Sequence, residues 1–320
     1  MKIIEKKIDY IIIFFCILFP ISLITGPFLP DLFIVLLSFF FLLYLNKNKN
    51  YTFLNNKFFF IFLSLYFYLL FSSFNSNYVF ESLSSSLFYF RFIFYTLGLC
   101  YFFLKIKNSI SLFSYSIIVC IFILLIDTIF QIIYGFNIFG FKLIGIRYSS
   151  FFGDELIMGS YCVRLLGVFL ICILISFKSE KIFRFYVIPL IIVSSILITL
   201  SAERTALLYL VLFLKLLFFY LPYLRKFFLP GFIKVIVFIA IITFYDFSIF
   251  ERIFFKTSSQ IFLIDKFSFH FFSFEHHQLF KKSLLMFSDN IIFGVGPGMY
   301  ENSCQKYISA SELFCSNHPH

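Results

Sequence analysis

Long apolar stretches recur along almost the whole chain, and they constrain its fold more than any other feature. Hydrophobic residues make up 61% of the 320 positions, well above the share in an ordinary soluble domain. Each stretch is about long enough to cross a hydrocarbon core of roughly 30 Å as a helix. The strict apolar-polar alternation of a lipid-facing barrel strand is absent from the sequence. These features predict an all-α polytopic membrane protein.

The ends of the apolar stretches place about nine transmembrane helices. The predicted ranges are 10–25, 30–45, 58–74, 87–104, 113–134, 156–177, 185–200, 205–221 and 232–249. The first follows three lysines but precedes no small-residue cleavage site, so it is predicted to be a retained helix rather than a signal peptide. We expect residues 1–249 to form the transmembrane domain and residues 250–320 to form a large external segment.

Basic residues in the loops predict the orientation of the chain. Fourteen of them lie in the amino-terminal segment and the loops on its side, and only three lie in the short loops on the other side. The positive-inside rule therefore places the amino terminus in the cytoplasm and residues 250–320 outside. The net charge of +10 largely reflects this topology. Because the basic residues form no single patch, nucleic-acid binding is not predicted.

Three arginines on the predicted outer side are not explained by this rule: Arg91 and Arg164 inside helices, toward their outer ends, and Arg204 in the tight turn between the seventh and eighth helices. A charge inside a transmembrane helix costs roughly 2.5–3.5 kcal/mol on insertion scales, so it usually faces a partner or a cavity. One interpretation is simple pairing of Arg91 or Arg164 with Asp127 or Asp154. The other is an outward-facing pocket for an anionic, diphosphate-bearing lipid, because the guanidinium fork suits phosphate oxygens.

All five histidines fall in the external segment, and the last two, His318 and His320, flank a proline. Their spacing fits no zinc motif, so no metal site is predicted. Histidine titrates near neutrality and is the commonest general base. On spacing alone, an ordinary loop and a proton-handling pair both remain open. The glycine run at 294–298 lacks the lysine of a phosphate loop. It predicts a tight turn that returns to the membrane face.

The seven cysteines divide into two groups. Cys304 and Cys315 lie in the external segment, where an oxidising compartment would allow a disulfide; the sequence leaves their pairing open. The others fall in predicted helices, where they are expected to be buried apolar residues. They are Cys16, Cys100, Cys120, Cys162 and Cys172.

Four segments together resemble the O-antigen polymerase/ligase family of bacterial envelope glycan synthesis, over roughly residues 80–320. They are Arg147–Glu155 with Gly159-Ser160-Tyr161 after it, Ser201–Leu207, Gly294–Gly298 and His318-Pro319-His320. Members of this family usually continue beyond the histidine with an asparagine and further spans. The resemblance therefore implies that the chain is a fragment or a natural truncation, and a natural truncation is expected to be inactive or unstable.

The resemblance implies a membrane glycosyltransferase of the bacterial inner membrane. Such an enzyme moves an oligosaccharide from undecaprenyl diphosphate to an acceptor glycan or to the lipid A core on the periplasmic face, without cofactor or obligatory metal. Its partners would be this donor, this acceptor and membrane lipids. Arg204 is similar to the family arginine that engages the donor diphosphate, and His320 to the histidine that deprotonates the acceptor. Arg91, Arg147, Arg164 and His318 are predicted as further substrate contacts.

Two other functions remain open. A transferase of another polyprenyl-phosphate class commonly carries acidic metal motifs in an early outer loop, where this chain offers only Glu81. A flippase or transporter of polyprenyl-linked glycans could also use the arginines. A transporter needs polar groups along a path through both leaflets, whereas the unexplained charges here lie mainly in the predicted outer half. The sequence does not separate a polymerase from a ligase.

Overall fold

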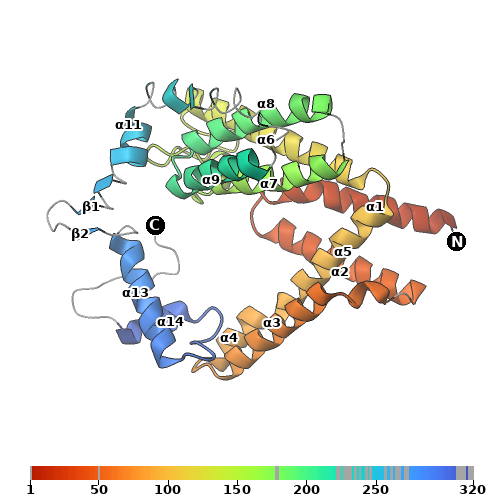
Figure 1. Ribbon diagram of the computed structural model, residues 1–320. Coiled ribbons are helices and arrows are strands. Elements are labelled where there is room, and N and C mark those ends of the chain that lie inside the picture. Colours follow the sequence, from red (N-terminus) through yellow and green to blue (C-terminus); the bar gives the residue numbers. More distant parts are fainter. Residues whose placement is uncertain are drawn as a thin grey trace. The chain divides into compact units, whose positions relative to one another are not determined.

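A computed structural model describes residues 2–49, 51–176, 180–220, 225, 233, 236–237, 239–241, 244, 247–255, 258–259, 262–263, 268–269, 274–307 and 315. The chain divides into two compact units, and Figure 1 labels its helices and strands. Unit 1 comprises Met1–Phe33 and Phe102–Lys256, and unit 2 comprises Ile34–Tyr101 and Thr257–His320. The change predicted near residue 250 lies close to one of these boundaries. The grouping of residues 34–101 with the external segment was not predicted.

Eight of the predicted ranges fall on helices. These are α1 (Lys2–Ser22), α2 (Phe28–Asn48), α3 (Lys57–Phe74), α5 (Phe90–Lys105), α6 (Ser109–Tyr134), α7 (Met158–Ser176), α8 (Glu180–Leu200) and α9 (Arg204–Tyr220). In the described part, α2, α3, α6, α7 and the continuous stretch Val79–Lys105 are long and apolar enough to cross a membrane. The all-α membrane class is thus confirmed. The ninth range, 232–249, lies largely outside the described residues, and nine spans and their orientation remain predictions.

Shorter elements join and follow these helices. They are η1 (Thr52–Leu54), α4 (Val79–Ser86), η2 (Leu87–Tyr89), η3 (Ser150–Phe152), α11 (Phe247–Phe250), η5 (Glu251–Phe255), α13 (Phe274–Asp289), α14 (Tyr300–Cys304) and η7 (Gln305–Tyr307). A two-residue antiparallel ribbon pairs β1 (Phe262–Leu263) with β2 (Ser268–Phe269).

The core of unit 1 lies where α6, α7 and α8 pack together, with α1 and α9 against them. Leu124, Leu166 and Phe169 are completely buried there. Polar side chains also join these helices: Tyr161 of α7 donates a hydrogen bond of 2.5 Å to the Pro20 carbonyl of α1. Gly135, at φ +77°, ends α6, because glycine adopts the left-handed conformation without strain. This packing fixes the amino-terminal ends of α7 and α9 and the carboxyl-terminal end of α8, which carry the candidate site.

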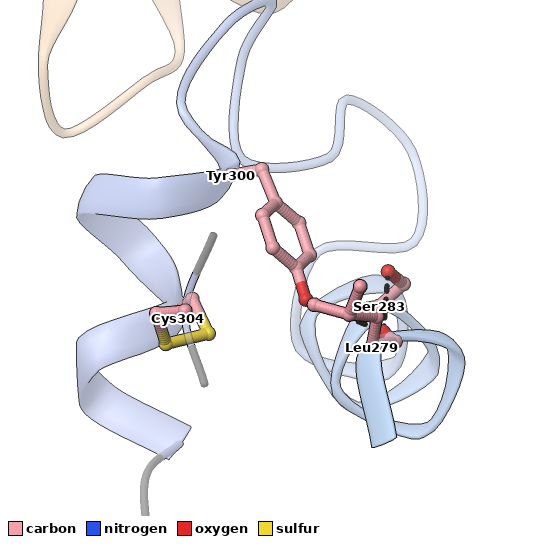
Figure 2. Close-up of a disulfide and its surroundings, with 5 residues drawn as sticks. Leu279, Ser283, Tyr300 and Cys304 are labelled. Carbon is pink, nitrogen blue, oxygen red and sulfur yellow. Dashed lines mark hydrogen bonds between the residues drawn. A yellow bond between two sulfur atoms is a disulfide. The ribbon is translucent and has the colours of Figure 1, made fainter. Parts of the chain in front are cut away.

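Four of the five helical cysteines are buried as predicted, and the prediction is wrong for Cys100, which is exposed. Ile93 and Leu97 are buried on one face of α5, and this burial does not extend to Cys100, one turn further along the helix. The disulfide that the sequence left open is present, joining Cys304 to Cys315 with their Cα atoms 5.7 Å apart. Figure 2 shows Cys304 on α14, near the place where Tyr300 reaches from α14 toward α13.

The glycine run packs closely against serines of α4 and of the loop between α3 and α4 in unit 2. A Cβ atom on Gly296 would lie 2.7 Å from Cβ and Oγ of Ser76 and 2.7 Å from Oγ of Ser82, and one on Gly298 would lie 2.5 Å from Oγ of Ser85. Such distances are far inside van der Waals contact. The run therefore serves close backbone approach, and not turn geometry alone.

We expect Gly296→Ala to destabilise the protein by about 2–4 kcal/mol, because it adds overpacking to a left-handed backbone. Gly294→Ala is the matched control: its φ of +66° is also positive, but nothing lies within 4 Å of the added Cβ. Thermal unfolding of the two variants in detergent measures the difference. Equal losses would show that close packing contributes nothing at Gly296.

Candidate functional site

The candidate site is built on the tight turn between α8 and α9, residues 201–203. Ser201, Ala202 and Glu203 are all nearly inaccessible. The backbone of Ala202 has a φ of +49°, a left-handed conformation that is uncommon for alanine. The Ser201 hydroxyl donates to the Ile198 carbonyl at 2.7 Å and accepts from the backbone N–H of Glu203 at 3.3 Å. The turn is thus held in one conformation, and it places Arg204 at the first position of α9.

Glu203 turns back from this loop to cap α7. Its carboxylate accepts from the N–H of Gly159 at 2.7 Å, and from the N–H and hydroxyl of Ser160 at 3.1 and 2.6 Å. A carboxylate is stabilised at a helix amino terminus by the free N–H groups and by the helix dipole. The approach requires glycine at 159, where a Cβ would lie 2.4 Å from the Ser201 hydroxyl oxygen. Glu203 therefore fastens the turn to α7.

Two further arginines donate to the carbonyls of the turn. Arg147 donates from Nε to Ser201 O at 3.2 Å and from Nη2 to Leu156 O at 2.8 Å. Arg252, in η5, donates from Nε to Ala202 O at 3.4 Å. Residues from three separate parts of the sequence thus meet at one turn, and we call Arg147, Arg204 and Arg252 the arginine cluster.

The arginine cluster brings three guanidinium groups to one turn. Burial lowers the pKa of Arg147, the charges of Arg252 and Arg204 lower it further, and that of Glu203 raises it. A guanidinium nevertheless stays protonated at neutral pH. The Glu203 carboxylate already accepts three hydrogen bonds from α7. All three arginines are partly exposed. Such an arrangement attracts an anion with several oxygens, such as a phosphate or diphosphate.

Comparisons of the chain with protein-family models, curated proteins and solved structures find no match. The chemistry of the site is therefore inferred from its geometry and charge.

Arg252 was not among the predicted site residues. A signal for it exists in the sequence, because Glu251 and Arg252 directly follow the last predicted helix on the side that carries Arg147 and Arg204. The sequence predicts residues 250–320 as a single external segment, and a charged residue in such a segment is not unusual. Its contact with Ala202 depends on how η5 packs, which no sequence pattern indicates.

Of the other predicted residues, the structure describes Arg164 and Arg91 but not the two histidines. Arg164 is exposed on α7, one turn after Ser160 on the same face of the helix. Arg91 lies on α5 in unit 2, with its guanidinium carbon 5.1 Å from the centroid of the Phe92 ring. His318 and His320 fall outside the described residues. Their predicted roles are neither supported nor contradicted.

Pairing of an arginine with Asp127, one of the two sequence interpretations, is wrong. Asp127 is completely buried, and its carboxylate accepts from the Ser150 hydroxyl at 2.5 Å and from the Ile138 N–H at 2.9 Å. Gln131 accepts from the Ser150 N–H at 3.0 Å, and Asn137 donates to the Ser150 carbonyl at 2.9 Å. These bonds tie the loop after α6 to the helix end. Asp127 thus orders the loop that carries Arg147, and Asp154 is exposed.

Proposed function

We propose that the chain is a glycosyltransferase of the O-antigen polymerase or ligase type, a multi-pass protein of the bacterial inner membrane. It would move an oligosaccharide from undecaprenyl diphosphate to an acceptor glycan or the lipid A core at the periplasmic face. The observation that carries this proposal is the arginine cluster around the 201–203 turn. Two of its members, Arg147 and Arg204, belong to the segments on which the resemblance to this family rests.

The charge of the cluster suits the leaving group of this reaction. Attack of an acceptor hydroxyl at the anomeric carbon breaks the bond to the carrier diphosphate, so negative charge develops on the departing phosphate oxygen. Fixed guanidinium groups stabilise this charge without reorganising as the reaction proceeds. Arg204 would contact the diphosphate directly. Arg147 and Arg252, which also hold the turn, would contribute positive potential around it.

The proposed base is His320, with His318 as a neighbouring contact to the acceptor. A neutral imidazole can take the proton of the attacking hydroxyl near pH 7. Arg91 and Arg164 are proposed as further contacts to the phosphates or glycan of the donor. These roles rest on the sequence resemblance and on charge placement alone.

A flippase or transporter of polyprenyl-linked glycans is the alternative, because such a protein would also need to hold a diphosphate. The arginine cluster fits the headgroup in both cases. Transfer consumes the lipid-linked donor and lengthens or attaches a glycan, whereas transport leaves the donor chemically unchanged. The product, rather than binding, therefore distinguishes the two functions.

Binding of undecaprenyl diphosphate to the full chain in nanodiscs tests the anion site. We expect Arg204→Lys to weaken binding by about 10-fold or more, because a charge-assisted hydrogen bond to phosphate contributes about 1.5–3 kcal/mol. Arg225→Lys is the matched control: Arg225 lies beyond the other end of α9 and donates to the Phe218 carbonyl. Undecaprenol, which lacks the diphosphate, should bind all three proteins equally. Unchanged diphosphate affinity in Arg204→Lys would contradict the proposed contact.

Activity is tested by replacing Arg204 or His320 with alanine and comparing the envelope glycans of cells that depend on this gene. We expect short or unattached chains in both variants. Normal long chains in both would contradict the proposed enzyme. A chemically unaltered lipid-linked donor that accumulates on the cytoplasmic side would favour the transporter.

A further inference from the structure

A row of hydroxyl groups holds the glycine-rich segment of unit 2. Four side chains donate these hydrogen bonds, and we call them the hydroxyl ladder: Tyr68, Ser72, Ser76 and Ser82. They donate to the backbone carbonyls of Ile292, Phe293, Val295 and Pro297 at 2.8, 2.5, 2.7 and 3.2 Å. Side chains therefore satisfy four carbonyls of the irregular backbone between α13 and α14, residues 290–299, and backbone N–H groups satisfy those of Asn290, Gly296 and Met299. We call this segment the glycine loop.

The hydroxyl ladder fixes the depth of the glycine loop beside α3. This helix has 18 residues, about 27 Å at 1.5 Å per residue, which is slightly less than the roughly 30 Å of a hydrocarbon core. If α3 spans the membrane, its last two turns lie within one leaflet. Ser72 and Tyr68 belong to these turns, so the carbonyls of Phe293 and Ile292 lie at the same depth.

Irregular backbone is tolerated at membrane depth only where its polar groups have partners. The hydroxyl ladder supplies such partners. The side chains of Ile291 and Ile292 are nevertheless 66% and 70% exposed. Exposure of two adjacent isoleucine side chains to water is unfavourable. Satisfied carbonyls together with exposed apolar side chains are what a segment immersed in lipid requires.

The helix that leads into the glycine loop has a matching apolar face. Phe280, Leu284 and Phe287 of α13 are each more than half exposed, and steps of four and three residues place them on one face of the helix. The opposite face is occupied, since Lys282 and Met286 are buried, and α14 packs there, with Tyr300 donating to the Leu279 carbonyl at 3.4 Å (Figure 2).

We propose that the glycine loop is a re-entrant segment and that α13 is an interfacial helix, both seated in the leaflet at which α3 ends. The partner of this surface is the acyl-chain region of the lipid bilayer. Helix α13 has 16 residues, too few to span a bilayer, and amphipathic helices of this kind lie in the interface with their apolar face buried. In unit 2 this anchoring holds the segment after residue 274 at the membrane surface. The proposal does not depend on the proposed function.

Tryptophan fluorescence tests the proposal directly, because the chain contains no tryptophan. Ile292→Trp and Phe287→Trp each introduce one fluorophore at an exposed apolar position. The full chain is reconstituted in phosphatidylcholine vesicles with and without lipids brominated on their acyl chains. We expect emission shifted to the blue and strong quenching by bromolipid at both positions, comparable with Phe71→Trp on the exposed face of α3. Gln305→Trp, exposed at the start of η7, should be quenched at least three-fold less.

Three outcomes would overturn the proposal. Emission typical of water, without quenching, at either test position would place that side chain outside the bilayer. Blue-shifted emission without quenching would mean that protein, such as a second copy of this chain, covers the surface instead of lipid. Equal quenching of Gln305→Trp would show that contact with lipid is not specific to the glycine loop and α13, so that neither is a distinct inserted segment. Circular dichroism of each variant confirms that it keeps its helices.

Discussion

Glu203→Ala should be the most damaging single substitution in unit 1, lowering the free energy of unfolding by about 3–5 kcal/mol. The change leaves the N–H groups of Gly159 and Ser160, and the Ser160 hydroxyl, without the carboxylate that they contact. It also removes the acidic group that acts on Arg147 against the charges of Arg204 and Arg252. The loss of a helix cap and the loss of a counter-charge therefore add at one residue. Unfolding in mixed micelles, followed by circular dichroism, measures the effect.

Glu155→Ala is the control for Glu203→Ala, because Glu155 is exposed and its removal changes the net charge equally. We expect it to change stability by no more than about 0.5 kcal/mol. The charge contribution can be separated from the cap by adding Arg147→Ala. If like-charge repulsion follows the loss of Glu203, Arg147→Ala should cost less in the Glu203→Ala background than in the unmodified protein. Additive effects would show that Glu203 acts only as a cap, and equal stability of Glu203→Ala and Glu155→Ala would contradict both roles.

Hydrophobic patterning predicts the helices of this protein well. In lipid, the backbone polar groups of a long apolar stretch must be hydrogen-bonded within the protein, and a helix satisfies them within the stretch itself. The predicted ranges 58–74 and 113–134 agree closely with α3 and with most of α6. Patterning is less informative about which helices pack together. Each stretch is apolar on all sides, so no periodic face indicates its neighbours. For this reason the grouping of residues 34–101 with the external segment could not be predicted.

The candidate site was predicted only in part, for a similar reason. Arg147 and Arg204 were singled out because a charge in an apolar context is costly and therefore informative. Arg252 lies in a more polar context, where a charge carries no such signal. One of the two interpretations of the charges paired Asp127 with an arginine, because an ion pair is the usual way to keep a buried charge. Its partners are instead a hydroxyl and a backbone N–H, which every loop can offer and no sequence pattern identifies.

Gly159→Ala and Gly167→Ala should change stability in opposite directions, although both glycines lie inside α7. Alanine is favoured over glycine in a helix by about 1 kcal/mol. At Gly167 the nearest atom to an added Cβ is Cε2 of Phe213, at an ordinary 3.9 Å, so this gain should be realised. At Gly159 the added Cβ would lie 2.4 Å from Ser201 Oγ, 3.1 Å from the Ala206 Cβ and 3.2 Å from Glu203 Oε1. Overpacking of this kind costs about 1–3 kcal/mol, so a net loss is expected.

This pair of variants also tests whether the turn must stay close to α7 for the anion site to work. Gly159→Ala removes no charge and no hydrogen-bonding group, yet it must push Ser201 and Glu203 away from the helix and shift Arg204 with them. We therefore expect it to weaken binding of undecaprenyl diphosphate, whereas Gly167→Ala should leave binding unchanged. Thermal unfolding and binding in nanodiscs can be measured on the same preparations. If Gly159→Ala lowers the stability but leaves diphosphate binding unchanged, Arg204 reaches its ligand independently of the turn. If Gly159→Ala raises the stability, the close packing of the turn against Gly159 is contradicted.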